Sequence, residues 1–232
     1  MTLTMWRDIA AIFDGIGRRR EIRAIILTGA DGNFSVGADV SEFSAVRSNR
    51  AESKAYEVAV DTASDAISNV PQPVIAVLEG YCLGGGCHLS MACDFRYAHK
   101  DSSIGIPAAK LSIVYGVRST RRLLSLVGLV NAKRVLYAAE RFSAEHAHQI
   151  GLVDHVSPDP MADATAFAQR LSALAPLSIQ GAKKILTGLS MGAGCLDQDA
   201  ADAFIDQVSE SGDYKEGRAA FSEKRPAEFR GS

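Results

Sequence analysis

VIAVLEGYCLGGGCHLSMACD, residues 74–94, is the stretch that decides the fold. Its apolar beginning, Val74–Leu78, is flanked by a proline and a glycine and predicts a buried strand. Three glycines follow at positions 84–86, and the run Cys87–Ala92 is compatible with a helix. A strand that passes through glycines into a helix leaves unpaired backbone N–H groups, which an electron-rich ligand can approach closely. Taken alone, the three glycines are equally typical of tight strand–helix packing.

The composition is that of a globular protein with a sizeable core. The 232 residues are 47% hydrophobic and 22% charged, enough for one domain with an appendage or for two small domains. Lys plus Arg number 25 and Asp plus Glu 27, and this near balance argues against nucleic acid as the main partner. No apolar run approaches the ~18 residues of a membrane helix, and the N-terminus lacks an apolar signal core. We therefore expect a cytoplasmic chain with no membrane partner.

The four cysteines do not form the spacing of a metal site. They are Cys82, Cys87, Cys93 and Cys195, and no C-x-x-C pair occurs among them, although His88 lies beside the first three. We expect reduced, mostly buried thiols, with neither zinc nor disulfides.

The order of the predicted elements indicates an α/β core followed by helices. Residues 5–17 predict a helix and Ala24–Thr28 a strand, and the polar stretch Ser41–Asn69 is interpreted as a mobile surface helix or lid. Further along the chain we expect a strand at Phe95–Ala98, an irregular segment at Ile104–Gly116, helices at Arg118–Val127 and from an Asn131 cap to Glu140, a short helix capped by Ser143, and an edge strand at Val153–Val156. After Pro158 every segment predicts a helix, the last one capped by Asp213 with Glu216.

Two of the strands lead into bends that contain glycine. Ala24–Thr28 precedes the bend at Gly37-Ala38, and Val74–Leu78 precedes the bend at Gly84–Gly86. Two such bends side by side would aim two backbone N–H groups at one point. A carbonyl oxygen that gains negative charge in a reaction needs two convergent donors, each worth roughly 3 kcal/mol of transition-state stabilisation.

Several stretches resemble the crotonase superfamily, also called the enoyl-CoA hydratase/isomerase family. They are FSVGADVSEF (34–43), EGYCLGGGCHLSMACDFRYA (79–98), IGIPAAKLSIVYGVRSTRRL (104–123) and, at the C-terminal helix, EGRAAFSEKRPAEF (216–229). The resemblance covers nearly the whole chain in the family's order. It implies an α/β crotonase-like spiral of ββα units, with residues 1–175 as the acyl-CoA-binding core and residues 176–232 as a C-terminal helical oligomerisation region.

The resemblance also implies a site. In the family two backbone N–H groups bind the thioester oxygen of an acyl-CoA, and the matching groups here belong to Ala38 and Gly85. It implies that further residues contact coenzyme A: Asp39, Val40, Ser41 and Gly84 in the same bends, and Phe221 and Lys224, commonly from a neighbouring subunit of a homotrimer or hexamer. Coenzyme A is then part of the substrate, and we expect no separate cofactor and no metal.

Departures from the family pattern affect the chemistry. Hydratases of the family carry glutamates where this chain has His88 and Ala108, so the two-glutamate addition of water and the single-glutamate isomerase mechanism both lose their acid–base groups. His88 is either a substitute base or a core residue. Tyr115 stands where some decarboxylating members have a tyrosine, but those members also carry a histidine where Ala38 sits. Tyr115 is therefore either a hydrogen-bond donor near the acyl group or a packing residue.

Two further observations complete the comparison with the family pattern. The family's leading β-hairpin and basic loop have no counterpart before the first helix, so either these pieces are truncated or they are absent. Arg118, Arg121 and Arg122 predict a solvated or subunit-contact face, and Asp39 a hydrogen-bonding partner at the bend.

The sequence thus supports three hypotheses. The first is an enoyl-CoA hydratase/isomerase-type enzyme, a lyase or isomerase of fatty acid metabolism, that stabilises an enolate of an acyl-CoA; decarboxylation of a malonyl-type CoA is its alternative. The second is a non-catalytic acyl-CoA-binding protein. The third is a structural subunit.

Overall fold

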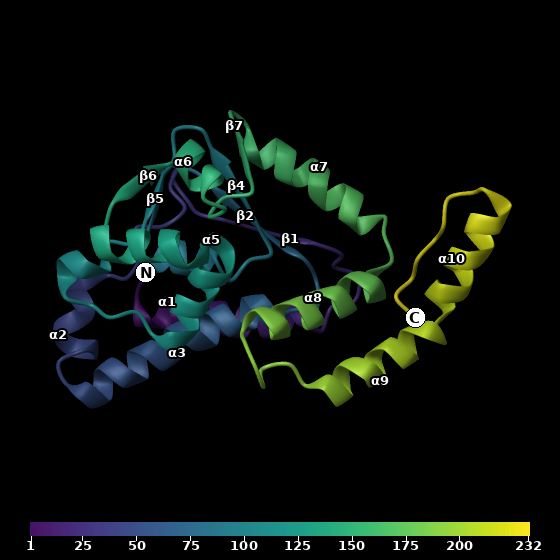
Figure 1. Ribbon diagram of the computed structural model, residues 1–232, viewed down its shortest axis with the longest axis horizontal. Helices are drawn as coiled ribbons and strands as arrows, with labels where there is room; N and C mark the ends of the chain where they lie inside the picture. Colours follow the sequence, from purple (N-terminus) through teal and green to yellow (C-terminus); the bar gives the residue numbers. More distant parts are fainter.

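A four-stranded parallel sheet forms the centre of the molecule in the computed structural model, which describes residues 1–232 (Figure 1). Its strands, in spatial order, are β1 (Ile25–Thr28), β2 (Val74–Leu78), β4 (Phe95–His99) and β7 (His155–Ser157). All five residues of β2 are buried, as predicted for an unbroken apolar run in the middle of a parallel sheet. β7 lies at the predicted edge but begins two residues later than expected, because only 155–157 pair with β4.

A second, three-stranded sheet lies beyond the C-terminal end of β2. It contains β3 (Tyr81–Leu83), β5 (Ser103–Gly105) and β6 (Arg141–Ser143), with β3 and β5 parallel and β5 and β6 antiparallel. β5 occupies the start of a segment that we expected to be irregular. Strands of three residues are too short to show a periodic pattern. They form because neighbouring strands of the same sheet supply their hydrogen-bond partners.

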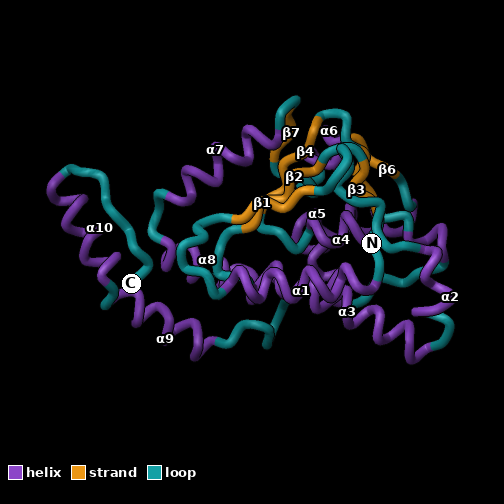
Figure 2. Tube along the Cα trace, turned by 180° about the vertical axis from the view of Figure 1, so that it is seen from behind, coloured by secondary structure: helices purple, strands orange, loops and turns teal.

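The helices α1 (Leu3–Gly17) and α3 (Arg50–Asn69) run side by side under the main sheet (Figure 2). Trp6 of α1 is fully buried and donates its Nε1–H to the hydroxyl of Tyr56 of α3 at 2.9 Å. The expectation of a single mobile surface helix or lid at Ser41–Asn69 is therefore wrong. This stretch forms η1 (Val40–Glu42), α2 (Phe43–Val46) and α3, and α3 buries a narrow face of small and aromatic side chains that its polar composition concealed.

The middle of the chain contains α4 (Gly85–Ser90), η2 (Ala108–Leu111), α5 (Val117–Ala138) and α6 (Ala144–Gln149). α5 covers the two helices expected there and is interrupted by a non-helical Gly128. Asn131 is not an N-cap, because its side-chain amide donates to Val127 O within α5 at 3.0 Å. Ser143 caps α6 as predicted, accepting from His146 N.

The chain ends with α7 (Pro160–Ser172), α8 (Pro176–Ser190), α9 (Gln198–Ser209) and α10 (Gly212–Glu223), and the last two extend away from the sheet (Figure 1). Ser211, not Asp213, caps α10 by accepting from Tyr214 N. Asp213 instead accepts from the backbone N–H groups of Arg230 and Gly231 and so fastens the C-terminal segment to α10.

Cys82, Cys87 and Cys93 are buried free thiols, and Cys195 is an exposed one. No group of three His, Cys, Asp or Glu side chains is arranged to hold a metal ion. None of the helices combines the length and the apolar character needed to cross a bilayer.

Candidate active site

The Gly37-Ala38 bend and the Gly84–Gly86 bend lie against each other. A Cβ built on Gly37 would come within 2.7 Å of Gly85 N, and one built on Gly85 would come within 3.3 Å of Ala38 N. Gly37 and Gly84 have φ values of +94° and +54°, a region in which a side chain is strained. Glycine is thus needed for the backbone conformation as well as for the close approach of the two bends.

Hydrogen bonds fix both bends and leave two donors free. The first bend is held by Ser35, which pairs with β3, and by Met1, whose amino group donates to Gly37 O at 2.6 Å and whose carbonyl accepts from Asp39 N. The N–H groups of Ala38 and Gly85 have no acceptor anywhere in the chain. Free donors on a rigid backbone suit a ligand oxygen, because no reorganisation is required when that oxygen binds.

A cavity of about 190 Å³ opens beside these two amides. Most of its wall is apolar. It is lined by residues of α1, α3, the two bends and the segment after β5, among them Trp6, Val36, Phe43, Tyr56, Val60, Pro107, Ala108 and Ile113. A largely apolar cavity with a few polar groups is typical of a small-molecule binding site.

His88 is 2% exposed and lies on α4, one turn after Gly85. Its Nε2 is 2.6 Å from the hydroxyl oxygen of Ser64, and that hydroxyl lies 3.0 Å from Val60 O. Since the Ser64 proton is directed to Val60, we assign the ring proton to Nε2, which leaves Nδ1 without a hydrogen-bond partner in the chain. Burial, helped by the charge of Arg122, lowers the pKa of His88 to about 3. The imidazole is therefore neutral at physiological pH and weakly basic.

Tyr115 also lines the cavity, with its ring edge-on to His88 at a centroid distance of 6.2 Å. Its hydroxyl has no hydrogen-bond partner in the chain, and burial raises its pKa above the ordinary value. Ala108 also faces the cavity and is 7% exposed, but it supplies no acid–base group.

The residues expected to contact coenzyme A fall into two groups. Ala38, Val40, Gly84 and Gly85 line the cavity, while Asp39 uses its carboxylate locally, accepting from both the backbone N and the hydroxyl of Ser41. Phe221 is 87% exposed on α10 and Lys224 caps the same helix, far from the cavity (Figure 1). Within one chain, therefore, the structure does not bring these two residues to the bends.

Sequence reasoning missed the contribution of α3 to the cavity. Tyr56, Glu57 and Asp61 all line it, and they were overlooked because the helix was interpreted as a surface lid. The spacing of four residues between Glu57 and Asp61 places these two on one helical face, but nothing in the sequence shows that this face borders a cavity. The prediction for Arg122 was also wrong: it is 6% exposed rather than solvated, and its Nη2 donates to Asp65 of α3 at 2.6 Å.

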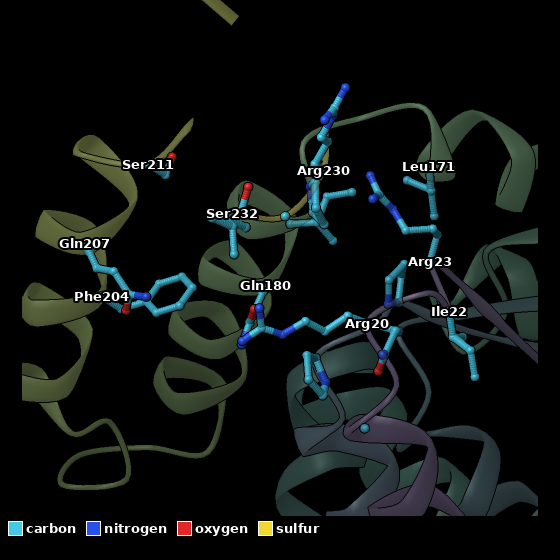
Figure 3. A pocket seen from close by; sticks show the side chains of 18 of the residues that line it. Arg20, Ile22, Arg23, Leu171, Gln180, Phe204, Gln207, Ser211, Arg230 and Ser232 are labelled. Carbon is cyan, nitrogen blue, oxygen red and sulfur yellow. The ribbon is translucent and has the colours of Figure 1, made fainter. Parts of the chain in front are cut away.

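Larger cavities lie elsewhere and contain neither bend. One, of about 610 Å³, lies between α8, α9, the C-terminal segment and the loop that follows α1 (Figure 3). Its walls carry Arg20, Arg23, Gln180, Phe204, Arg230 and Ser232. Another, of about 640 Å³, lies between α3, α5 and α8. The smaller cavity remains the candidate active site because it alone adjoins the two free amides.

Comparison with known proteins identifies the family of the chain. The family model described as enoyl-CoA hydratase/isomerase matches residues 1–232. The chain is 35% identical over 241 residues to a putative enoyl-CoA hydratase/isomerase, YngF, of Bacillus subtilis, covering 100% of this chain and 89% of that protein. It is 34% identical over 229 residues to the short-chain-enoyl-CoA hydratase of Clostridium acetobutylicum, covering 96% and 85%.

Solved structures confirm the predicted fold. An enoyl-CoA hydratase/carnithine racemase from Magnetospirillum magneticum is similar with a TM-score of 0.92 at 32% identity, covering 100% of this chain and 87% of that one. An enoyl-CoA hydratase from Bacillus anthracis gives a TM-score of 0.87 at 32% identity, covering 100% and 90%. The chain therefore belongs to the enoyl-CoA hydratase/isomerase family, the crotonase superfamily.

Proposed function

We propose that the protein is an enzyme that binds an acyl-CoA thioester and stabilises its enolate. The thioester oxygen accepts from Ala38 N–H and Gly85 N–H, and the acyl group enters the cavity beside them. The observation that carries this proposal is the pair of adjacent backbone N–H groups with no acceptor in the chain. Each donor contributes roughly 3 kcal/mol when negative charge develops on the oxygen.

The reaction class follows from what the two donors favour. When a proton leaves the α-carbon, the electron pair of the C–H bond forms a C=C bond, and the charge collects on the oxygen held by Ala38 and Gly85. Isomerisation of an enoyl-CoA, and reactions that begin with α-proton removal, pass through this enolate. Relatives named as hydratases and isomerases support this class. Ala108 and His88 leave the two-glutamate addition of water without its groups.

His88 and Tyr115 shape the cavity and offer hydrogen bonds to the acyl group. The low pKa of His88 makes it a poor proton acceptor, since catalytic bases work best with pKa values near the working pH. A second candidate reaction is the decarboxylation of a malonyl-type CoA. The observation in its favour is the hydroxyl of Tyr115, which has no partner in the chain and could donate a hydrogen bond near the acyl group. Two unpaired carboxylates in the same cavity, Glu57 and Asp61, repel a substrate carboxylate and weigh against it.

We further propose that coenzyme A enters only as part of the substrate and that Asp39, Val40 and Ser41 border the path it takes. In homotrimers or hexamers, Phe221 and Lys224 of a neighbouring chain would contact the same coenzyme A. The exposed position of Phe221 supports the last part, because a free aromatic ring on a protruding helix is suited to a contact between chains.

The test is mass spectrometry of a panel of saturated, enoyl- and malonyl-CoA thioesters incubated with the protein in heavy water. We expect deuterium at the α-carbon, with or without conversion. Matched S-alkyl-CoA thioethers, which lack the carbonyl oxygen, should bind at least tenfold more weakly than the thioesters. Binding without labelling across the panel would favour the non-catalytic acyl-CoA binder, and equal binding of thioether and thioester would exclude the oxygen site.

A further inference from the structure

Two carboxylates of α3, Glu57 and Asp61, line the same cavity as the free amides of Ala38 and Gly85. They are four residues apart, so they project from one face of the helix. Neither makes a hydrogen bond or an ion pair with another group of the chain. Asp61 is the more buried of the two. Glu57 is exposed and Asp61 is partly buried, so it is the charge of Asp61 that burial in the apolar wall penalises.

Asp65, the next carboxylate along the same face of α3, does form ion pairs and so contrasts with Glu57 and Asp61. Asp65 lies one turn further along α3 and binds two arginines of α5, Arg118 and Arg122, at 2.6 Å. The cations nearest to this face are thus used by Asp65. Asp61 has no ion-pair partner of its own, and burial, followed by repulsion from Asp65, raises its pKa although the charges of Arg118 and Arg122 oppose this shift.

Glu57 is placed over the turn between Tyr115 and α5. A Cβ on Gly116 would collide with Glu57 Oε1, so glycine at this position makes room for the carboxylate. The charge of Glu57 also contributes to the raised pKa of Asp61.

We propose that Asp61 is the catalytic residue that removes the α-proton of a thioester bound at Ala38 and Gly85 and returns it, with Glu57 as the neighbouring carboxylate on the same face of α3. This inference rests on the proposed function. It supplies that function with the acid–base group that His88 and Ala108 do not provide.

The proton transfer balances without any further reactant. The Asp61 carboxylate takes the α-proton and becomes a carboxylic acid, while the C–H electron pair forms the enolate C=C bond and the thioester oxygen gains the negative charge. Return of the proton from Asp61 to the α-carbon, or to the γ-carbon of a β,γ-unsaturated chain, restores the carboxylate and completes exchange or isomerisation. A raised pKa suits both halves of this cycle, because the group must accept and release a proton near neutral pH.

The charged and titratable groups around Asp61 come from its own helix, from α5 and from the rest of the cavity wall. Its own helix contributes Glu57 and Asp65, and α5 contributes two cations. The remaining ionisable groups of the cavity are Arg47, Tyr56, His88 and Tyr115, and burial raises the pKa of the Tyr56 hydroxyl, which therefore stays protonated. Of these, His88 is neutral, and burial keeps the Tyr115 hydroxyl protonated. Asp61 is therefore the partly buried carboxylate of the cavity, with a raised pKa and no ion-pair partner in the chain.

The experiment compares α-deuterium labelling by wild type, Asp61→Asn, Asp61→Glu and the matched control Asp8→Asn, which changes an exposed carboxylate of α1. We expect Asp61→Asn to label about 100-fold more slowly or worse, Asp61→Glu to restore part of the rate, and Asp8→Asn to match wild type. Acyl-CoA affinity by calorimetry should stay within threefold for Asp61→Asn, and its melting temperature should not fall, because an uncompensated charge is removed.

The pH profile tests Glu57. The wild-type labelling rate should rise with pH as Asp61 loses its proton, and this limb should be absent in Asp61→Asn. Glu57→Gln should move the limb to lower pH, since removal of a neighbouring negative charge lowers the pKa of Asp61. If wild type labels its substrate and Asp61→Asn labels equally fast, Asp61 is not the base although the proposed function stands. If wild type binds acyl-CoA without labelling, the proposed function itself fails.

Discussion

At the scale of single residues, the close approach of two bends depends on Gly37. Its φ of +94° is costly for any side chain, and a Cβ there would stand 2.7 Å from Gly85 N, in the space between the two bends. Gly37→Ala should lower the free energy of unfolding by about 1–2 kcal/mol through backbone strain. It should also abolish the rise in melting temperature that acyl-CoA produces in wild type, as measured by differential scanning fluorimetry.

Gly15→Ala provides the matched control. Gly15 lies inside α1, has no neighbour within 4 Å of an added Cβ, and has ordinary helical geometry. The same chemical change should therefore stabilise the protein by about 0.5–1 kcal/mol and leave the ligand-induced shift intact. A Gly37→Ala protein that still responds to acyl-CoA like wild type would contradict an oxygen site between the bends.

His88 makes a separate prediction about stability. Its pKa is about 3 in the folded chain, whereas an unfolded histidine titrates near 6.5. Between these values the unfolded state binds an extra proton, so stability is complete above pH 6.5 and is lost as the pH falls toward 3. Across the two pH units from 6.5 to 4.5 this loss amounts to about 2–3 kcal/mol.

The measurement is urea denaturation of wild type and His88→Gln at pH 7.5 and pH 4.5. His88→Gln lacks the titrating group, so its loss of stability between the two pH values should be smaller than that of wild type by about 2–3 kcal/mol. Any cost of repacking the ring is present at both pH values and cancels. Equal losses in the two proteins would show that His88 is protonated in the folded state.

At the scale of the elements, Lys183 ties α8 to the body. It is 9% exposed, and its Nζ donates to Asp94 Oδ2 at 2.7 Å and to the carbonyls of Ile67 and Gln72. Lys183→Met leaves these buried acceptors unpaired and should lower the free energy of unfolding by about 3 kcal/mol. The control is Lys184→Met, which changes the next residue, whose side chain is exposed. Its free energy of unfolding, measured for both variants by urea titration, should stay within about 0.5 kcal/mol of wild type. Equal effects of the two substitutions would mean that Lys183 contributes only its apolar stem.

The elements that sequence analysis predicted well are those whose pattern is local. β2 is an unbroken apolar run, α1 has a helical spacing, and the helices after Pro158 carry clear caps or prolines. The sequence analysis did not predict the strands β3 and β6, and it assigned most of β5 to an irregular segment. Three residues are too few to show a periodic hydrophobic pattern, and the pairing partners of these strands are distant in the sequence. The prediction that Asn131 is an N-cap was wrong because the helix already resumes after Gly128, so Asn131 lies inside α5.

The site was predictable to the extent that glycines mark it. The positive φ values of Gly37 and Gly84 impose glycine at the two bends, so both bends were recognisable in the sequence. Tyr56, Glu57 and Asp61 were not, because a helix that is polar on most of its surface does not reveal which face borders a cavity. The burial of Arg122 depends equally on a partner 57 residues away, Asp65.

At the scale of the whole molecule, the C-terminal helices α8, α9 and α10 carry large apolar side chains that are exposed. Leu186 and Leu189 of α8 are 66% and 61% exposed, Ile205 of α9 is 52% exposed, and Phe221 of α10 is 87% exposed. Single exposed leucines are ordinary, but a succession of them along consecutive helices is typical of a surface that other chains cover. This supports the prediction that the protein assembles into homotrimers or hexamers.

Light scattering coupled to size-exclusion chromatography tests the assembly. Wild type should elute with the mass of three or six chains, and Leu189→Asp should shift toward one chain, because burying an unpaired carboxylate in an apolar contact costs several kcal/mol. If neighbouring chains bring Phe221 and Lys224 to coenzyme A, the dissociated variant should also bind acyl-CoA at least tenfold more weakly, although Ala38 and Gly85 are unchanged. A monomeric wild type that binds acyl-CoA as tightly as an assembled one would place all coenzyme A contacts within a single chain.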